Sequence, residues 1–191
     1  MKKVLLLLVF GSSVALASAQ TTFGVKAGAN FATITDASGA KTKVGIVGGL
    51  QANLHLSSMF SFAPEAVYSS QGAKATGETV NLNYINVPLL LQYNNESGFF
   101  AHTGPQIGFL MSAKDKADGS GSTDIKDVMN STDFAWVIGA GFATHSGFGF
   151  NARYNYGFSK IFKSDVGSNS KNSVIQAGVF YNFSSGGSAK K

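Results

Sequence analysis

The sequence predicts an all-β fold, a single eight-stranded antiparallel barrel that crosses a membrane, on three observations. Apolar residues recur at every second position over eight stretches of about ten residues, which is the spacing of a strand and the length of a tilted membrane strand. Charged residues make up only 13% of the chain and aromatic residues 12%, which is unusual for a surface covered by water. Beyond residue 20 no apolar run has the length of a membrane helix, so membrane insertion requires a closed barrel.

The first segment has the pattern of a secretory signal peptide. Met1 to Lys3 form a cationic start, residues 4–10 are apolar, and Ala-Ser-Ala at 17–19 is a small-x-small cleavage site. We therefore expect residues 1–19 to be removed, residues 20–183 to form the barrel and residues 184–191 to form a flexible tail. Removing two lysines leaves 13 basic against 10 acidic residues, a net charge of +3 instead of +5. That charge does not favour nucleic acid as a partner, and the absence of cysteine excludes disulfides and thiolate sites.

The first four stretches, residues 23–31, 44–56, 60–69 and 84–93, each present one apolar face. We predict that this face contacts lipid and that the opposite face lines the barrel. The residues assigned to lipid are Phe23, Val25, Ala27, Ala29 and Phe31; Val44, Ile46, Gly48, Leu50, Ala52, Leu54 and Leu56; Phe60, Phe62, Pro64, Ala66 and Tyr68; and Ile85, Val87, Leu89, Leu91 and Tyr93.

The last four stretches, residues 99–109, 134–142, 148–158 and 175–183, repeat the pattern. The third of them is the sharpest, because six apolar residues alternate there with glycine, asparagine and arginine. The residues assigned to lipid are Phe99, Ala101, Thr103, Ile107 and Phe109; Phe134, Trp136, Ile138, Ala140 and Phe142; Phe148, Phe150, Ala152, Tyr154, Tyr156 and Phe158; and Ile175, Ala177, Val179, Tyr181 and Phe183.

The opposite face is mostly glycine, asparagine, glutamine and serine, which are small enough to fill a narrow barrel. Only three charged residues, Lys26, Glu65 and Arg153, lie within the eight stretches, and all three belong to this polar face. A lone charge in such an interior is costly, so we predict that the three form a cluster that plugs the barrel. A gated path for ions or protons through the same groups is the alternative.

The connections alternate in length. Residues 57–58, 94–97 and 144–147 are short, whereas residues 33–42, 70–81, 112–133 and 159–172 are long. Short turns at one rim and long loops at the other are typical of outer-membrane barrels, and this order puts both chain ends at the short-turn, periplasmic rim. Three prolines, Pro64, Pro88 and Pro105, fall inside the stretches. Because proline removes a donor from the hydrogen-bond ladder, we expect β-bulges at these positions.

The longest connection, residues 112–133, is the candidate recognition loop. It carries Asp115, Asp118, Asp124, Asp127 and Asp133. Oxygen-rich loops of this kind can bind calcium, but the spacing does not match an EF-hand, so a solvated loop without metal is the favoured interpretation. Adaptable contacts concentrate in long loops on a rigid scaffold, and any extracellular contact is expected here.

The sequence does not indicate an enzyme or a cofactor site. Hydrolysis would require a nucleophile and an orienting carboxylate near His55, His102 or His145. We expect the first two to point into the barrel and the third to lie in a periplasmic turn without an acid beside it. No nucleophile motif is recognisable.

Residues 24–31, 84–93, 104–110 and 178–183 resemble the outer-membrane beta-barrel domain family, the PorT-like porin-family proteins of Bacteroidetes-type bacteria. The resemblance covers nearly the whole chain after the signal peptide. It implies an eight-stranded barrel in the outer membrane, with lipid and the barrel-assembly machinery as partners. It also implies that Phe183 is the closing aromatic residue that this machinery recognises, although here the chain continues through residues 184–191.

These inferences predict an outer-membrane barrel with a structural, adhesive or envelope-assembly role and a side-chain-filled interior that does not conduct. A small-solute pore and a lipid-modifying enzyme are the alternatives that the sequence leaves open. A third alternative is a soluble exported barrel of the lipocalin type, in which the apolar side chains would point inward around a ligand. The sequence identifies no ligand and no extracellular or periplasmic protein partner.

Overall fold

The computed structural model describes residues 21–35, 41–75, 77–117, 121–163 and 169–183. The signal peptide and the tail expected from the sequence lie outside these residues. No helix in the described part of the chain is long and apolar enough to cross a membrane. The elements are β1 (Thr21–Ile34), β2 (Lys41–His55), β3 (Phe60–Ala75), β4 (Glu78–Asn94), β5 (Phe99–Ala117), β6 (Ser122–Asp124), the 3-10 turn η1 (Lys126–Val128), β7 (Thr132–Ala143), β8 (Phe148–Gly157) and β9 (Asn172–Asn182).

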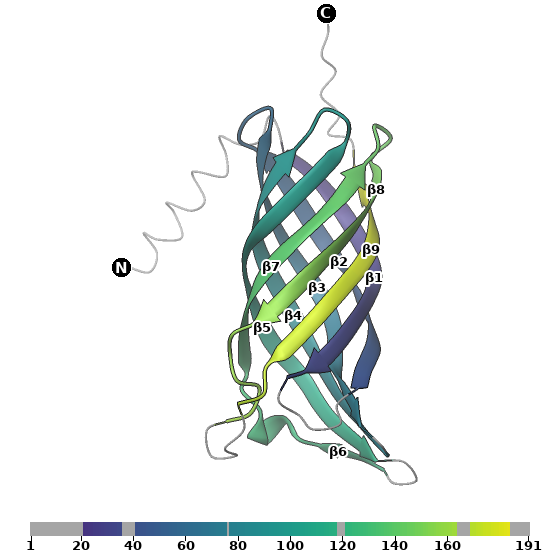
Figure 1. The fold of residues 1–191 in the computed structure, drawn as a ribbon, viewed down its shortest axis with the longest axis vertical. Coiled ribbons are helices and arrows are strands. Elements are labelled where there is room, and N and C mark those ends of the chain that lie inside the picture. The colour runs from purple at the N-terminus through teal and green to yellow at the C-terminus, as the bar shows by residue number, and fades with distance from the viewer. Residues whose placement is uncertain (1–20, 36–40, 76, 118–120, 164–168, 184–191) are drawn as a thin grey trace, which may run out of the picture.

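The eight long strands form a closed antiparallel barrel. Each strand pairs with its neighbours in chain order, and β9 pairs with β1 to close the sheet. The strands are steeply tilted against the long axis (Figure 1), as closure of eight strands requires. The three-residue strand β6 is outside the cylinder and pairs only with the far end of β5. This architecture confirms the predicted fold class.

The apolar side chains face outward and the polar side chains face inward. Along β8 the burial alternates strictly, so that Phe150 is 57% exposed and Tyr154 38%, whereas Asn151 and Arg153 are buried. The other strands follow the same rule, and most of the exposed large apolar side chains lie on the outer wall of the barrel. A lipocalin-type barrel would have the opposite arrangement, so the structure excludes this alternative.

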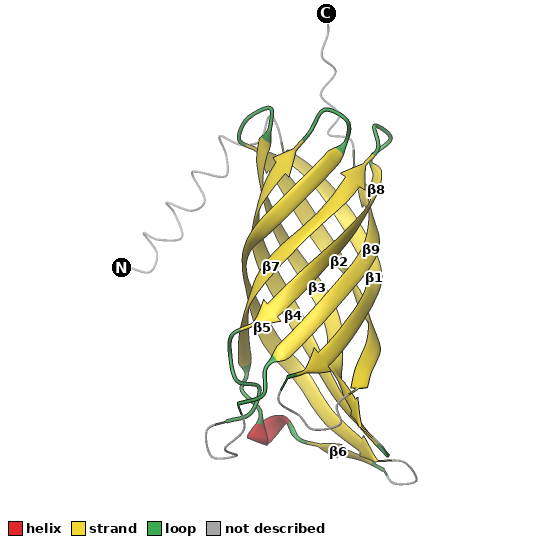
Figure 2. Cartoon of the chain, in the orientation of Figure 1, coloured by secondary structure: helices red, strands yellow, loops and turns green. Residues whose placement is uncertain are grey.

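Three tight connections and the last described residues lie at one end of the barrel, which we call the short-turn rim (Figure 2). Gly98 and Gly147 have positive φ angles in two of these turns, a conformation that favours glycine over other residues. The remaining connections, including β6 and η1, lie at the opposite end, which we call the loop end.

Strands β3, β4 and β5 are longer than predicted and extend beyond the other strands at the loop end. The connection expected at residues 70–81 is instead a hairpin in which Ala75 pairs with Glu78. The connection expected at residues 112–133 begins with strand, because β5 continues to Ala117. Beyond the lipid the outer face of these strands becomes polar, while the inner face carries apolar residues such as Ala73 and Leu82. The apolar-out, polar-in pattern that predicts the membrane strands is therefore inverted there. A bulge in β5, opposite Asn83 and Tyr84, also shifts the alternation by one residue.

The predicted bulges at the three prolines are wrong. The register runs without a shift past Pro64, Pro88 and Pro105. The missing N–H of a proline removes one rung of the ladder but inserts no residue, so the flanking bonds hold the register. The shifts in register lie elsewhere, between Thr42 and Val47 in β2 and at the bulge in β5.

Candidate functional site

The three charged residues singled out in the sequence meet inside the barrel. Lys26 Nζ lies 2.8 Å from Glu65 Oε1, and Arg153 Nη1 donates to Glu65 Oε2 at 2.7 Å. They come from β1, β3 and β8, none of which are neighbours in the sheet, so these contacts cross the barrel interior. All three side chains are buried. We call Lys26, Glu65 and Arg153 the charge triad.

Amides and a glycine complete the surroundings of the triad. Arg153 Nη2 donates to Gln176 Oε1 at 3.2 Å. Gly139 provides the space, because a Cβ there would lie 2.5 Å from Arg153 Cβ and 2.7 Å from His102 Nε2. A buried ion is stable only when it is paired and hydrogen-bonded. The triad therefore ties three parts of the wall together and leaves no room for a solute at its level.

A cavity of only about 30 Å³ lies between the triad and the short-turn rim. Its lining includes Asn53, Glu65, His102 and Asn151, together with the rings of Phe100 and Phe180. These two rings pack edge to face with their centroids 5.8 Å apart. A space of this size is enough for a water molecule or two but not for an organic solute.

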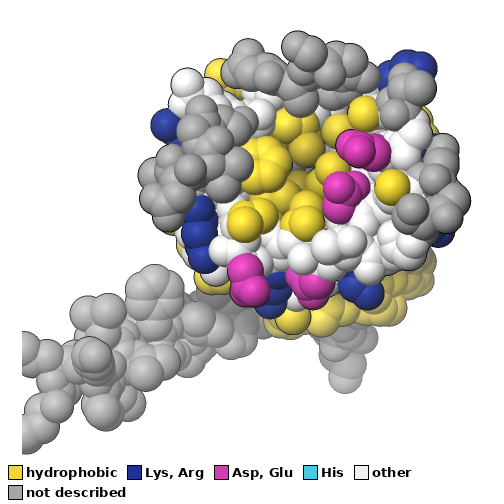
Figure 3. All heavy atoms as spheres, turned by 90° about the horizontal axis from the view of Figure 1, so that it is seen from below, with side chains coloured by type: hydrophobic (Ala, Val, Ile, Leu, Met, Phe, Trp, Pro, Cys, Tyr) yellow, Lys and Arg dark blue, Asp and Glu magenta, His cyan; other side chains and the backbone are white. Residues whose placement is uncertain are grey.

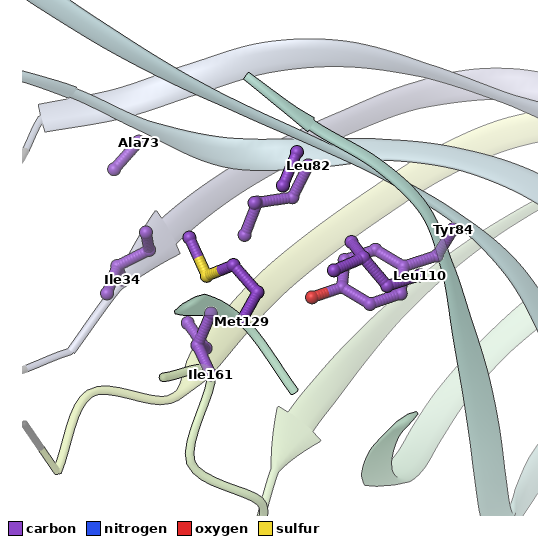
Figure 4. Packing of buried hydrophobic residues seen from close by; sticks show 8 residues of the cluster. Ile34, Ala73, Leu82, Tyr84, Leu110, Met129 and Ile161 are labelled. Carbon is purple, nitrogen blue, oxygen red and sulfur yellow. The ribbon is translucent and has the colours of Figure 1, made fainter. Parts of the chain in front are cut away.

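The loop end of the barrel is closed by apolar side chains instead. A cluster of buried residues fills it (Figure 4). On the barrel wall, Ser69 pairs with Tyr84 of this cluster, and Glu65 lies four residues nearer the short-turn rim. The cluster therefore lies between the triad and the loop end. We call it the apolar plug, and it consists of Ile34, Ala73, Leu82, Tyr84, Leu110, Ala113, Met129 and Ile161.

Two loops cover the plug on the side that faces out of the barrel. Met129, from the connection between β5 and β7, and Ile161, from the connection between β8 and β9, insert their side chains between those of the wall. Met129 forms an isolated β-bridge with Phe162. Asn130 Nδ2 donates to the carbonyl oxygens of Lys160 at 2.8 Å and Phe162 at 3.0 Å. The two loops are therefore bonded to each other as well as to the barrel.

The structure distributes the five aspartates of the candidate recognition loop over different environments. Asp124, at the end of β6, and Asp127, in η1, are exposed at the loop end. Asp115 belongs to strand β5, and Asp118 lies outside the described residues. Asp133 was predicted to be in the loop, but it is a buried residue of β7. Its Oδ2 accepts a bond from Asn172 Nδ2 at 3.0 Å, beneath the plug.

The sequence prediction missed two features of the interior. It left Lys43 outside the predicted strands, but Lys43 lies in β2 with a buried side chain whose Nζ donates to the carbonyl oxygen of Gln71 at 3.0 Å. It also missed the plug, because Leu82, Leu110, Met129 and Ile161 lie outside the predicted strands. The available signals were the alternation of Leu82 with polar neighbours in β4 and the large apolar residues Met129 and Ile161 in otherwise polar loops.

The remaining candidate residues do not assemble a catalytic site in the described residues. His102 is buried beside the triad. His55 lies opposite the buried Ser61 and therefore on the inner face of the wall, but it is exposed because β2 ends there at the short-turn rim; His145 is exposed at the same rim. Nowhere in the described ranges do three or more metal-binding side chains gather. Phe183 is exposed beside Tyr181, and its backbone N–H donates to the Phe23 carbonyl at 2.7 Å.

The closed wall, the outward apolar side chains and the polar interior define an integral outer-membrane β-barrel protein. Comparison with known families agrees, because residues 17–163 match the family described as outer membrane protein beta-barrel domain. The chain belongs to this family. No curated protein sequence matches the chain significantly.

Solved structures with the same fold include several bacterial surface proteins. Neisserial surface protein A has a TM-score of 0.57 at 18% identity, with 86% of this chain and 99% of that chain covered. The attachment invasion locus protein Ail of Yersinia pestis has a TM-score of 0.53 at 17% identity and the same coverage. A major outer membrane protein from Thermus thermophilus has a TM-score of 0.52 at 12% identity, with 86% and 100% covered. At these identities the likeness extends to the fold.

Proposed function

We propose that this protein is a non-conducting barrel that holds an ordered surface outside the cell for attachment. The observation that carries the proposal is the double closure of the barrel. The charge triad fills the middle, and the apolar plug fills the loop end. A pore would need a continuous polar path, which two successive obstructions of opposite chemistry oppose.

The loop end has the properties of a binding surface. Residues 121–131 and 158–163, described parts of the two loops that carry Met129 and Ile161, are anchored by the plug and by hydrogen bonds, so they present their exposed side chains in a defined arrangement. A preformed surface binds with less loss of conformational entropy than a flexible loop. Ail, a protein of the same fold, is named for attachment and invasion, which favours an adhesive role over a purely structural one.

Planar bilayer recording tests the closed interior. Reconstituted protein is expected to show no steady conductance, whereas steady open events in the wild-type protein would establish the small-solute pore instead. The doubly substituted variant Glu65→Ala with Met129→Ala is the positive control, because it opens both obstructions and is expected to conduct intermittently.

Adhesion is tested with bacteria that lack their own adhesins and express this protein. We expect more cells to attach to a host-cell monolayer than with an empty vector, and fewer when a Gly-Ser linker replaces residues 121–128. Equal attachment by all three strains would reject the adhesive role. Heat-modifiable gel mobility of each variant shows that its barrel is folded.

The finer parts of the assignment belong to the same proposal. Cleavage after residue 19, membership of the PorT-like subfamily and recognition of Phe183 by the assembly machinery are inferred from sequence. The absence of enzymatic activity is supported by the separation of the three histidines in the fold. Lipid turnover by the purified protein would overturn it and favour the lipid-modifying enzyme.

A further inference from the structure

The wall that rises above the barrel carries lysines on its outer face. Lys41 of β2 lies directly opposite Lys74 of β3, and Lys74 lies opposite Thr79 of β4, which in turn lies opposite Lys116 of β5. Lys114 lies one step lower, opposite Asn81. Residues directly opposite each other in an antiparallel sheet lie on the same face. Four lysines from three strands therefore share one surface, which we call the lysine face.

These four ammonium groups are free to bind a ligand. All four residues are exposed, and none of their side chains has a hydrogen-bond or ion-pair partner among the residues that the structure describes. The acid nearest in register is Asp124, which lies opposite Lys114 on the same face; its Oδ1 accepts a bond from the backbone N–H of Lys126 at 2.9 Å, and it forms no ion pair with Lys114 in the described part of the chain. Like charges directly opposite each other destabilise a sheet. An anionic partner would relieve the repulsion between Lys41 and Lys74.

The lysine face continues the lipid-facing wall. Descending from Lys114, the outer surface passes Asn83 and Ser112 and then reaches Tyr68, Ile85 and Phe109, which face lipid. Lys114 is therefore about four residues above the apolar surface along the strand, roughly 13 Å, or about 10 Å in height after tilt. A lysine side chain can reach several ångströms back toward the membrane. Its ammonium group then falls in the headgroup layer.

At the loop end the lysine face lies on the outside of the wall, apart from the hydrophobic side chains that fill the opening of the barrel. Figure 3 shows hydrophobic side chains in the middle of this end, Lys and Arg side chains around its outer edge, and Asp and Glu side chains both near the middle and on one part of the edge. Asp115 alternates to the inner face of β5, away from Lys114 and Lys116. The outward charges on the wall of β2 to β6 are therefore the four lysines and Asp124, and the net charge of this wall is positive.

We propose that the lysine face binds the phosphate groups of phosphorylated lipids in the leaflet that surrounds the loop end. Phosphate is the partner that this surface fits, because several unpaired ammonium groups stand at headgroup height beside an apolar wall that the acyl chains cover. Bound lipid would hold the barrel at a fixed depth and keep the loop end clear of the membrane. The inference goes beyond the attachment function, since it concerns the outer wall and not the loops.

The test counts lipid bound to folded protein. Wild-type protein in neutral detergent micelles is titrated with bisphosphorylated lipid A and, separately, with the same glycolipid without phosphates, and bound lipid is measured by native mass spectrometry. We expect tight binding of the phosphorylated lipid only, weakening as salt is raised. The triple variant K74Q/K114Q/K116Q is expected to bind about a hundredfold more weakly, at about fivefold for each lysine.

Matched variants separate the lysine face from charge in general. Lys114→Gln should weaken binding about fivefold, whereas Lys160→Gln, an exposed lysine of the loop between β8 and β9, should leave it unchanged. A triple lysine-to-arginine variant should bind like the wild type. Heat-modifiable gel mobility checks that each barrel is folded, independently of binding.

Two results would overturn the proposal. One is equal binding of lipid A by the folded triple variant and the wild type. The other is binding of the phosphate-free glycolipid as tightly as lipid A. Preferential binding of soluble heparin over lipid A, lost in the triple variant, would also overturn it, because it would assign the lysine face to a polysaccharide.

Discussion

The two halves of the barrel interior are filled in opposite ways. From the middle toward the short-turn rim, the interior is filled by inward side chains of the wall itself, which meet in the charge triad. Toward the loop end, β3 to β5 extend beyond their neighbours, and in the described part of the chain Ile34 of β1 is the one residue of another strand that joins Leu82 and Ala113 in the plug. Met129 and Ile161 come from the loops to cover them. A narrow barrel can be filled by the inward side chains of its own strands. Where strands of unequal length leave apolar residues uncovered at one end, side chains from the loops must cover them.

The largest expected effect comes from breaking the triad. Glu65→Gln removes the one acidic partner and leaves Lys26 and Arg153 buried without a counter-charge. We expect the free energy of unfolding to fall by about 3–5 kcal/mol, as when one partner of a buried pair is removed. Urea unfolding of the protein refolded into lipid vesicles measures it.

Glu78→Gln is the matched control, because Glu78 is exposed at the start of β4. Its effect should stay within about 0.5 kcal/mol. If both substitutions cost the same, the triad does not hold the interior together and the contrast between the two halves fails.

The plug is expected to show a slightly smaller effect. Met129→Ala leaves a cavity among buried side chains and should cost about 2–4 kcal/mol. Because Met129 belongs to a loop, we expect the loss to appear first as faster proteolysis of residues 121–131 with the barrel intact. Val128→Ala, at an exposed neighbour, should change neither the stability nor the rate of cleavage; equal cleavage of the two variants would contradict a sealing role.

A glycine substitution sharpens the comparison on the triad side. Gly139→Ala places a methyl group against Arg153 and His102 and should cost about 1–3 kcal/mol through overpacking. Gly121→Ala at the loop end meets nothing within 4 Å and should be neutral within about 0.5 kcal/mol. The same urea titration compares them, and a neutral Gly139→Ala would mean that the interior has spare room.

The smallest predicted effect concerns the bonds between the loops. Asn130→Ala removes two side-chain hydrogen bonds to the carbonyls of Lys160 and Phe162 and should cost about 1 kcal/mol. Amide hydrogen exchange should accelerate in both loops and not in β8. Ser122→Ala, in the exposed strand β6, is the control and should leave exchange unchanged. If Asn130→Ala accelerates exchange in only one of the two loops, the loops are not coupled.

Sequence reasoning was most reliable where lipid imposes a strong contrast between the two faces of a strand. Phe148 to Phe158 alternate so strictly that the outward and inward residues of β8 could be assigned directly. The same reasoning placed Lys26, Glu65 and Arg153 on the inner face, but not their bonds. It failed for residues 70–81 and for Lys43 and Asp133, because the outer face of these strand ends lies beyond the lipid and no longer carries the apolar residues that mark a membrane strand.

The alternation of apolar and polar residues, together with the confinement of nearly all charged residues to the connections, determined the class of the fold, the number of barrel strands and the direction of their faces. Only the tertiary structure decided which inward groups meet, because Lys26, Glu65 and Arg153 are 39 and 88 residues apart in sequence and register alone brings them together. The tertiary structure also decided how the mouth closes. Met129 and Ile161 can pack only because β3, β4 and β5 extend beyond the other strands and leave their inward apolar side chains uncovered.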